Sequence, residues 1–163
     1  MQLPKSPLPS LRVIALDASH EALLQAFFDA NPAYFLAVYG EPAGPGEARE
    51  TIASLPPPDW PYTRRWLIGY VDDATGALAA LADGVSDLLA PGVWHIGLFI
   101  VASARHGTGD AQRLHQGLRA WAVGQGAAWL RLGVVAGNTR AERFWQAQGY
   151  RETRTRERVQ IGP

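Results

Sequence analysis

The sequence predicts a protein of the α+β or mixed α/β class, built around one sheet. Its 163 residues, 47% of them hydrophobic, are about enough for a single domain with its own core. Strand and helix patterns follow in the order strand, two or three helices, hairpin, fourth strand, and then helix, strand, helix, strand. We expect residues 1–10 to form a tail and residues 11–163 to form one domain.

The composition excludes several classes of protein. Fifteen Lys and Arg against fifteen Asp and Glu give zero formal net charge, which argues against a nucleic-acid or membrane surface. There is no cysteine, so disulfides, thiolate zinc ligands and a cysteine nucleophile are excluded. Residues 1–10 lack the apolar segment of a signal peptide, and no run reaches the ~18–20 apolar residues of a membrane span. We therefore expect a soluble, cytoplasmic protein.

One strand and two helices are predicted first. Residues 11–16 have a strand pattern, and Ser19 can N-cap the helix that follows. Asn31 ends that helix and, with Pro32, starts a second one that stops at Gly40. The apolar positions of the first helix recur with helical spacing: Leu23, Leu24, Phe27 and Phe28.

A third, short helix precedes a proline-rich connection. It has Ala48, Ile52 and Leu55 on one face. The run 56–61 is a stiff connection, because proline removes the backbone donor that regular structure needs. Since the run is internal, we interpret it as a loop rather than a domain boundary.

A hairpin and a fourth strand come next. Residues 65–71 and 77–82 have strand patterns and are joined by the turn residues 72–76. After a loop over residues 86–92, the apolar residues 94–101 predict the fourth strand.

Two more helices enclose a fifth strand. Residues 128–135 predict a buried strand, and Asn138 or Thr139 caps a last helix that stops at Gly149. From there, alternating polar residues predict a solvated strand over 150–161. The helix before the fifth strand directs four apolar residues inward: Leu114, Leu118, Trp121 and Ala122.

A glycine turn connects the fourth strand to the next helix. Gly107 and Gly109 let the backbone come close to a ligand, because they have no Cβ. The helix that follows directs its free N–H groups and the positive end of its dipole toward the same place. A strand, a glycine turn and a helix in this order form a phosphate-binding arrangement.

Two common nucleotide motifs do not fit this turn. A dinucleotide-binding turn needs a third glycine or alanine where this chain has Gln112, and an acidic residue about 20 positions on. Residues 135–138 contain no such acid. A P-loop needs a lysine after its last glycine, and the only lysine of the chain is Lys5.

The turn belongs to a longer pattern, Val101-x-Ser103-x-x-His106-x-x-Gly109-x-Ala111. This pattern resembles motif A of the GCN5-related N-acetyltransferases (GNAT), usually V-x-P-x-x-[Q/R]-x-x-G-x-[G/A]. The family's N-x-x-A-x-x-F-Y-x-x-x-G-F motif is similar to Asn138-x-x-Ala141-x-x-Phe144-Trp145-x-x-x-Gly149-Tyr150. Over about residues 11–161 the resemblance implies a GNAT-like fold. That fold has one central, mostly antiparallel sheet of six or seven strands, splayed between strands 4 and 5 and flanked by about four helices.

The resemblance also implies acetyl-CoA as acyl donor, with no metal. Its pantetheine arm would run between the fourth and fifth strands and bond to the backbone of Phe99, Ile100 and Val101. Asn138 would reach the pantetheine side, and Arg143, with Arg140, would meet the adenosine phosphates. The pyrophosphate would be held by the turn residues, which are His106, Gly107, Thr108, Gly109, Asp110 and Ala111.

Several positions depart from the family pattern. His106 stands where Gln or Arg is usual, Ser103 replaces a proline, and Asp110 puts a carboxylate into a phosphate loop. Trp145 replaces the tyrosine that many members use to protonate the leaving thiolate, which an indole cannot do. A thiol with a pKa of about 8.5 can leave unassisted, and Tyr150 is an alternative acid.

The expected reaction is direct transfer of an acetyl group to the amine of a small-molecule or peptide acceptor within a ternary complex. An ammonium ion has no lone pair, so a base must remove a proton before attack. Our candidate is His95, eleven residues before His106, where some family members carry a catalytic glutamate. A lone histidine on a strand is also commonly a hydrogen-bonded core residue, so both roles stay open.

The acceptor-binding residues would come from residues 31–62. Their aromatic content favours a small, partly apolar amine, because a basic peptide tail would need more carboxylates. These aromatic residues can equally pack under a long loop. The candidates are Tyr34, Tyr39 and Glu41, with Trp60 and Tyr62 nearby.

Two rival hypotheses remain. One is a non-catalytic domain that binds or senses acyl-CoA, and the other is a nucleotide-binding oxidoreductase, which would bind NAD but not CoA. The sequence leaves open the acceptor, the length of the acyl group and the oligomeric state. A homodimer would follow if the last strand pairs with a second copy.

Overall fold

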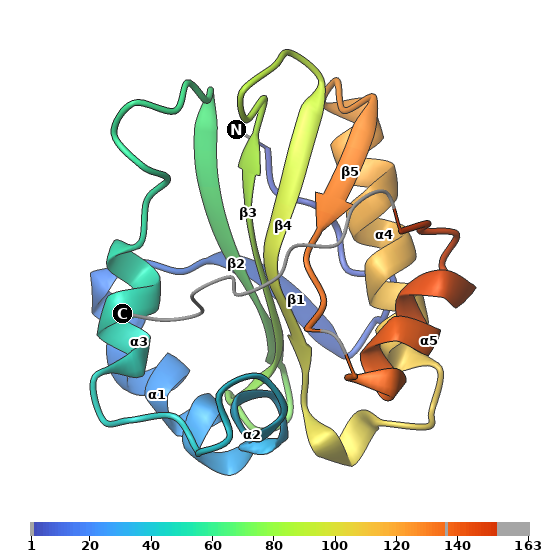
Figure 1. Ribbon diagram of the computed structural model, residues 1–163. Helices are drawn as coiled ribbons and strands as arrows, with labels where there is room; N and C mark the ends of the chain where they lie inside the picture. The colour runs from blue at the N-terminus through green and yellow to red at the C-terminus, as the bar shows by residue number, and fades with distance from the viewer. Residues whose placement is uncertain (1, 136, 153–163) are drawn as a thin grey trace.

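The computed structural model of the chain describes residues 2–135 and 137–152. Its strands form one sheet, and its helices pack around this sheet (Figure 1). In chain order the elements are β1 (Leu11–Ala15), η1 (Ala18–His20), α1 (Glu21–Ala30), α2 (Ala33–Tyr39), α3 (Glu47–Ala53), β2 (Arg64–Asp72), β3 (Leu78–Ser86), β4 (Val93–Val101), η2 (Ser103–Arg105), α4 (Asp110–Gly124), β5 (Trp129–Leu132) and α5 (Thr139–Ala147).

The described residues contain five strands in the order β1-β2-β3-β4-β5. The first four strands pair antiparallel, and β5 pairs parallel to β4. This confirms the α+β class and the single, mostly antiparallel sheet; five α-helices flank it within the described residues, where about four were expected. The predicted last strand, 150–161, falls mostly on residues 153–163, which lie outside the described residues. The count of six or seven strands therefore stays a prediction.

The strand pairing of β4 changes at Gly97, on both of its sides. On the β3 side, Gly84 and Asp83 pair with Ile96 and Leu98, so Gly97 is the extra residue of a β-bulge. On the other side, the ladder with β5 ends at Ile96, one residue before the bulge. From the bulge to the end of β4, the backbone therefore has no ladder partner on its β5 side among the described residues.

β5 is shorter and more exposed than predicted. It covers four residues instead of 128–135, and its side chains alternate between exposed and half-buried. Trp129 is 68% exposed. The prediction of a buried strand was wrong, because β5 is the edge strand of the described sheet and has a partner on one side only.

The sheet separates two hydrophobic clusters, because strand side chains alternate between its faces. Figure 1 shows α1, α2 and α3 grouped together and apart from α4 and α5. The cluster on the α4 face includes Trp66, Ile68, Trp94, Leu114 and Leu118. The cluster on the α1–α3 face includes Leu24, Phe28, Phe35, Leu67 and Leu81.

The start of the first helix differs from the prediction. Asp17, not Ser19, is the capping residue: its carboxylate accepts the Ser19 N–H at 2.9 Å, and Ser19 itself lies within η1. Asn31 does lie between α1 and α2, but its side chain makes longer-range contacts. It donates to Phe27 O at 2.9 Å and accepts the Ser103 N–H at 2.8 Å, so it attaches the helices to the loop after β4.

Glycines end the helices where predicted. α2 stops at Gly40 and α5 is followed by Gly149, with φ of 81° and 93°, a region that glycine enters without strain. Asn138 is the N-cap of α5 and accepts the Ala141 N–H at 3.3 Å. Leu55 was wrongly placed on α3: it lies beyond the helix and is 66% exposed.

The described part of the N-terminal segment packs along α4. Leu8 is buried in the cluster of the α4 face, and Trp121 donates its indole N–H to Gln2 O at 2.8 Å. A Cβ at Gly117 would lie 3.2 Å from Pro7 Cδ, so this segment lies close against the helix. α4 itself buries Leu114, Leu118 and Ala122 as predicted, and also His115; Trp121 is only half-buried.

Candidate active site

The segment from Val101, the last residue of β4, to Ala111, in the first turn of α4, is here called the glycine loop. Gly107 and Gly109 have φ of 78° and 86°, and nothing lies within 4 Å of a Cβ built on either. Among the described residues, the N–H groups of Gly107, Thr108, Gly109 and Ala111 have no hydrogen-bond partner. These donors stand at the start of a 15-residue helix, so the glycine loop is suited to bind an anion.

The charge of Asp110 is compensated within the glycine loop. Arg105 donates to the Asp110 carboxylate at 3.0 Å and to the Asp72 carboxylate of β2 at 3.2 Å, and all three side chains are largely buried. The Asp110 N–H is used as well, because it donates to Thr108 Oγ1 at 3.2 Å. The Asp110 carboxylate therefore pairs with Arg105 of the same loop. The Asp110 N–H is less available to a ligand than the N–H groups of the neighbouring residues are.

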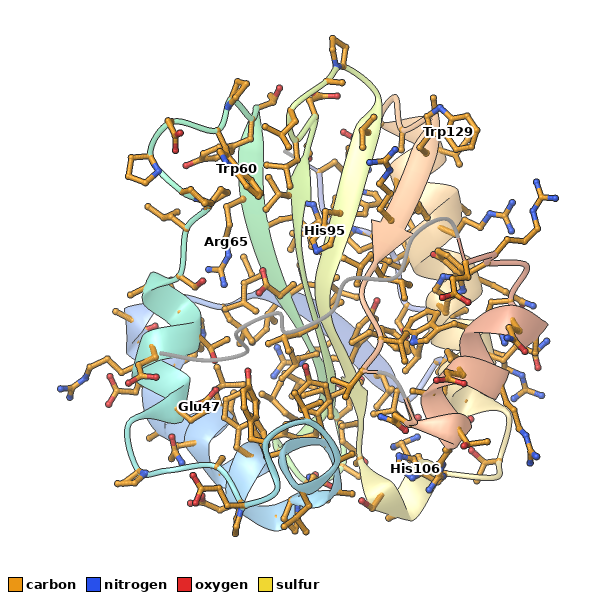
Figure 2. The ribbon with its side chains drawn as sticks, viewed as in Figure 1. Glu47, Trp60, Arg65, His95, His106 and Trp129 are labelled. Carbon is orange, nitrogen blue, oxygen red and sulfur yellow. The ribbon has the colours of Figure 1, made fainter. Side chains whose placement is uncertain are left out.

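His106 fastens the glycine loop to β4. Its Nε2 lies 2.9 Å from Val101 O, and because a carbonyl only accepts, Nε2 carries the proton. Figure 2 shows His106 near the end of β4 where the glycine loop begins, far along the sheet from His95. The part of β4 after its last pair with β5 contains Phe99, Ile100 and Val101, whose backbone is expected beside the cofactor.

Aromatic side chains from β4, α4 and α5 pack together beside this part of β4. The Phe99 and Trp145 ring centroids are 5.6 Å apart, and His115 Nε2 lies 2.8 Å from Tyr150 Oη. Burial lowers the pKa of His115 to about 4, helped by nearby Arg119, and burial raises the pKa of Tyr150 to about 12. Both groups are therefore neutral near pH 7, and the Tyr150 hydroxyl is engaged with a buried partner.

The predicted α5 contacts differ in exposure. Asn138 uses its side-chain oxygen to cap α5. Arg143 is exposed on the helix surface, as is Arg140. The structure therefore leaves both arginines accessible to an anionic ligand and gives Asn138 a structural contact as well.

His95 lies on the α1–α3 face of the sheet. It pairs in register with Val85 of β3 and Arg131 of β5, and it is half-buried. Figure 2 shows it on the upper half of β4, between Arg65 on one side and Trp129 on the other. Asp83 of β3 shares this face, because it is two residues before Val85.

Sequence reasoning missed an ion pair on the same face. Arg65 Nε donates to Asp83 Oδ1 at 3.0 Å, and only 12% and 15% of the two side chains are exposed. Burial raises the pKa of Asp83, and the Arg65 charge opposes that rise. The one signal in the sequence was an aspartate that follows the apolar residues 78–82 directly, in a stretch predicted to end there.

The predicted acceptor residues are brought together only in part. Tyr34 is half-buried, and its phenol pKa is raised mainly by burial and further by the charges of Tyr39, Glu47 and Asp83. Glu47, the first residue of α3, is close enough for its charge to raise the pKa of both tyrosines, whereas Glu41 is exposed on the loop after α2. Burial also raises the pKa of Glu47. Trp60 and Tyr62 are each 37% exposed. We call Tyr34, Tyr39, Glu47, Arg65 and Asp83 the acid–aromatic cluster.

Two hollows stand out on the described surface, whereas its side chains form no metal-ligand group. One hollow on the described surface runs along β2 and is lined by Leu3 and Arg65, and another lies between the loops at Tyr62 and Leu89. Within residues 2–135 and 137–152 no cluster of three or more His, Asp or Glu side chains is arranged to hold a metal ion. None of the helices described there has the length and apolarity required to cross a membrane.

The glycine loop, the open side of β4 and the order of elements agree with a known family. A model of the Acetyltransferase (GNAT) family matches residues 24–150. The chain belongs to this family and is an acetyltransferase. The comparison with curated proteins returned no match.

Solved structures share this fold. An acetyltransferase from Thermus thermophilus is 21% identical, with a TM-score of 0.70 over 87% of both chains. The ribosomal-protein-S18-alanine N-acetyltransferase of Escherichia coli is 14% identical, with a TM-score of 0.62 over 88% of this chain and 79% of that one. AAC(6')-Iy, solved with the bisubstrate analog CoA-S-monomethyl-acetylneamine, is 15% identical, with a TM-score of 0.58 over 94% and 99%. At these identities the likeness shows the fold.

Proposed function

We propose that this protein transfers an acetyl group from acetyl-CoA directly to the amine of a small molecule, within a ternary complex. The observation that supports this most is the glycine loop, where four N–H groups without a partner among the described residues stand at the start of α4. The loop lies at the end of the stretch of β4 that has no partner on its β5 side within the same part of the chain. A phosphate group and an extended chain can therefore bind side by side.

The residues present fit acetyl-CoA. Gly107, Thr108, Gly109 and Ala111 would hold the pyrophosphate through their N–H groups, and the open Cβ positions of the two glycines leave room for it. Phe99, Ile100 and Val101 would bond the pantetheine arm through the backbone, as an added strand does. His106 keeps the loop in place through Val101, Asn138 would lie on the pantetheine side, and Arg143 would meet the adenosine phosphates. Bound acetyl-CoA would supply a thioester that a neutral amine can attack.

His95 is the proposed base. An amine that arrives as its ammonium ion must lose a proton before it can attack, and imidazole is suited to accept one near neutral pH. A backbone N–H of β4 near Phe99 would stabilise the negative charge that develops on the acyl oxygen. Since Trp145 cannot donate a proton and the Tyr150 hydroxyl is bound to His115, the thiolate would leave without a general acid.

The acceptor is proposed to be a small amine that binds on the α1–α3 face. Tyr34 and Tyr39 with Glu47 supply aromatic surface and a carboxylate there, and Glu41 would contact an acceptor only from the exposed loop. One structural neighbour, from an uncultured soil metagenomic sample, is an aminoglycoside acetyltransferase, and aminoglycosides are small amines of this kind. We propose the same broad class, without a narrower identity.

A thiol-release assay with acetyl-CoA tests the proposal. A panel of aliphatic amines, amino acids and aminoglycosides is offered to the wild type and to His95→Ala. We expect release with at least one amine and a loss of about 10²-fold in His95→Ala, as for a general base. Release that is indifferent to the substitution would keep the reaction and remove His95 from it. Measurable CoA binding without release from any amine would favour the acyl-CoA sensor, which the engaged Tyr150 and the Trp145 replacement support.

A further inference from the structure

The buried ion pair of Arg65 and Asp83 is not explained by stability alone. The two side chains are 12% and 15% exposed and meet at 3.0 Å. Desolvation of two buried charges offsets most of their mutual attraction, so such a pair adds little net stability over apolar residues of similar size. The other contacts of Arg65 and Asp83 therefore indicate what the pair contributes besides stability.

Arg65 is held by three separate acceptors. Besides Asp83 Oδ1, its guanidinium donates to Ile52 O at 2.9 Å and to Thr51 O, both in the last turn of α3. A guanidinium fixed on three sides cannot turn toward the second carboxylate oxygen of Asp83. Arg65 therefore fixes the position of the carboxylate and leaves Oδ2 to another partner.

Asp83 Oδ2 faces the bulge of β4. A Cβ built at Gly97 would lie 3.5 Å from Oδ2, and no hydrogen bond joins Oδ2 to the described residues. Gly97 is itself exposed, so Oδ2 can be approached over a residue that has no side chain. The ladder between β4 and β5 ends one residue before Gly97, which places Oδ2 beside the stretch of β4 where the donor is proposed to bind.

We propose that Asp83 Oδ2 binds the acceptor as its ammonium ion, and so selects aliphatic amines that are charged at neutral pH. This inference rests on the proposed function, since the bound amine is the acceptor of that reaction. An ammonium N–H donated to a carboxylate is a charge-assisted hydrogen bond, which is stronger than a neutral one. Aromatic amines, which are neutral near pH 7, would lack it.

The groups around Asp83 agree with this role. Arg65 of β2 donates to Oδ1 only, so Oδ2 keeps its acceptor sites, and Tyr34 of α2 is close enough for the Asp83 charge to raise its pKa. Glu47 of α3, whose charge also acts on Tyr34, adds a second carboxylate, and burial raises its pKa. His95 of β4 lies on the same face as Asp83, opposite Val85 of β3, so an ammonium bound at Oδ2 is on the face that carries the proposed base.

Steady-state kinetics of Asp83→Asn test this assignment, with the aliphatic amine that gives the fastest thiol release from the wild type. We expect the acceptor KM to rise about 10- to 100-fold, in line with the loss of a hydrogen bond to a charged group. The Kd for CoA should stay within about twofold of wild type, because Asp83 is on β3 and the donor is proposed to bind on the β5 side of β4. Asp73→Asn, which removes the exposed pair with Arg12, is the matched control and should change neither quantity.

Gly97→Ala tests the same contact without touching the ion pair. The new methyl would meet Oδ2 at 3.5 Å, an ordinary contact, so the protein should fold and bind CoA while the acceptor KM rises. An unchanged acceptor KM in both folded variants would overturn the assignment of Asp83 and leave the proposed function intact. Absence of transfer to any amine by the wild type would instead defeat the proposed function, and this inference with it.

Discussion

Residues 101–111 form the glycine loop from one short stretch of chain, whereas the acid–aromatic cluster is assembled from α2, α3, β2 and β3. In the glycine loop, Arg105 and Asp110 are five residues apart, and His106 bonds to Val101. In the cluster, Arg65 reaches Asp83 across 18 positions and Thr51 across 14. Local contacts fix the proposed donor site, while tertiary packing fixes the proposed acceptor site.

This difference between the two regions indicates where changes of sequence are tolerated. A loop set by its own residues keeps its shape as long as its glycines and its internal bonds remain. A cluster drawn from separate elements changes whenever α2 or α3 shifts, so it can be adapted to new acceptors without altering the donor side. The predictions below test this separation, in order of decreasing effect.

Gly109→Val should give the largest change. Gly109 has φ of 86°, where a β-branched residue is strained by about 1–3 kcal/mol, and its side chain would project into the space proposed for the pyrophosphate. We expect the Kd for CoA to rise more than 10²-fold, measured by isothermal titration. Gly76→Val is the matched control, because Gly76 has φ of 73° and equally open surroundings but lies in the β2–β3 turn. An equal loss of CoA binding in both variants would contradict a local donor site.

His115 should make stability depend on pH. Its folded pKa of about 4 lies below the unfolded value near 6.5, so the unfolded chain binds the extra proton between these values. Stability is therefore lost as the pH falls through this window, by about 2 kcal/mol between pH 7 and pH 5. Urea unfolding at both pH values should show that His115→Leu loses about this much less than wild type does. Equal losses in the two proteins would mean that His115 is protonated as easily folded as unfolded.

Arg105→Gln should weaken CoA binding by a smaller amount. Without Arg105 the Asp110 carboxylate is unpaired beside the proposed pyrophosphate site, and we expect the Kd for CoA to rise about tenfold, or about 1.4 kcal/mol. The double variant Arg105→Gln with Asp110→Asn should recover most of the affinity, since the repelling charge is gone. Failure of the second substitution to restore binding would mean that Arg105 acts by a route other than Asp110.

Asp73→Asn should have the smallest effect. The Arg12–Asp73 pair is 60% and 53% exposed, and exposed pairs contribute about 0.2–1 kcal/mol. We expect the free energy of unfolding in urea to fall by less than about 0.5 kcal/mol, with no change in either substrate constant. A loss of several kcal/mol would show that the β2–β3 turn is more closely coupled to the core than its exposure indicates.

The sequence predicted what depends on local pattern. The hairpin, the long fourth strand, the glycine turn and the stops at Gly40 and Gly149 each follow from residues a few positions apart, and the structure confirms them. The sequence did not predict that Arg105 would also bond to Asp72, because Asp72 is 33 positions from Arg105. The edge position of β5 was missed for a related reason, since an apolar run does not show whether a strand has one partner or two.

The acceptor side depends least on local pattern. Tyr34, Tyr39 and Glu41 stay predictions as acceptor residues, and the carboxylate whose charge raises the pKa of both tyrosines is Glu47. Glu41 is closer in sequence, whereas the start of α3 brings Glu47 back toward α2. Asp83 belongs to no sequence motif. Its proposed role depends on the bulge at Gly97 and on the carbonyls that hold Arg65.

The most direct test of this account compares Arg105→Gln and Asp83→Asn in one experiment. Both the Kd for CoA and the acceptor KM are measured for each variant. The account predicts a crossed result: Arg105→Gln raises the Kd for CoA and leaves the acceptor KM unchanged, while Asp83→Asn does the reverse. If both substitutions change the same constant, the donor and acceptor sites are not separated as we propose.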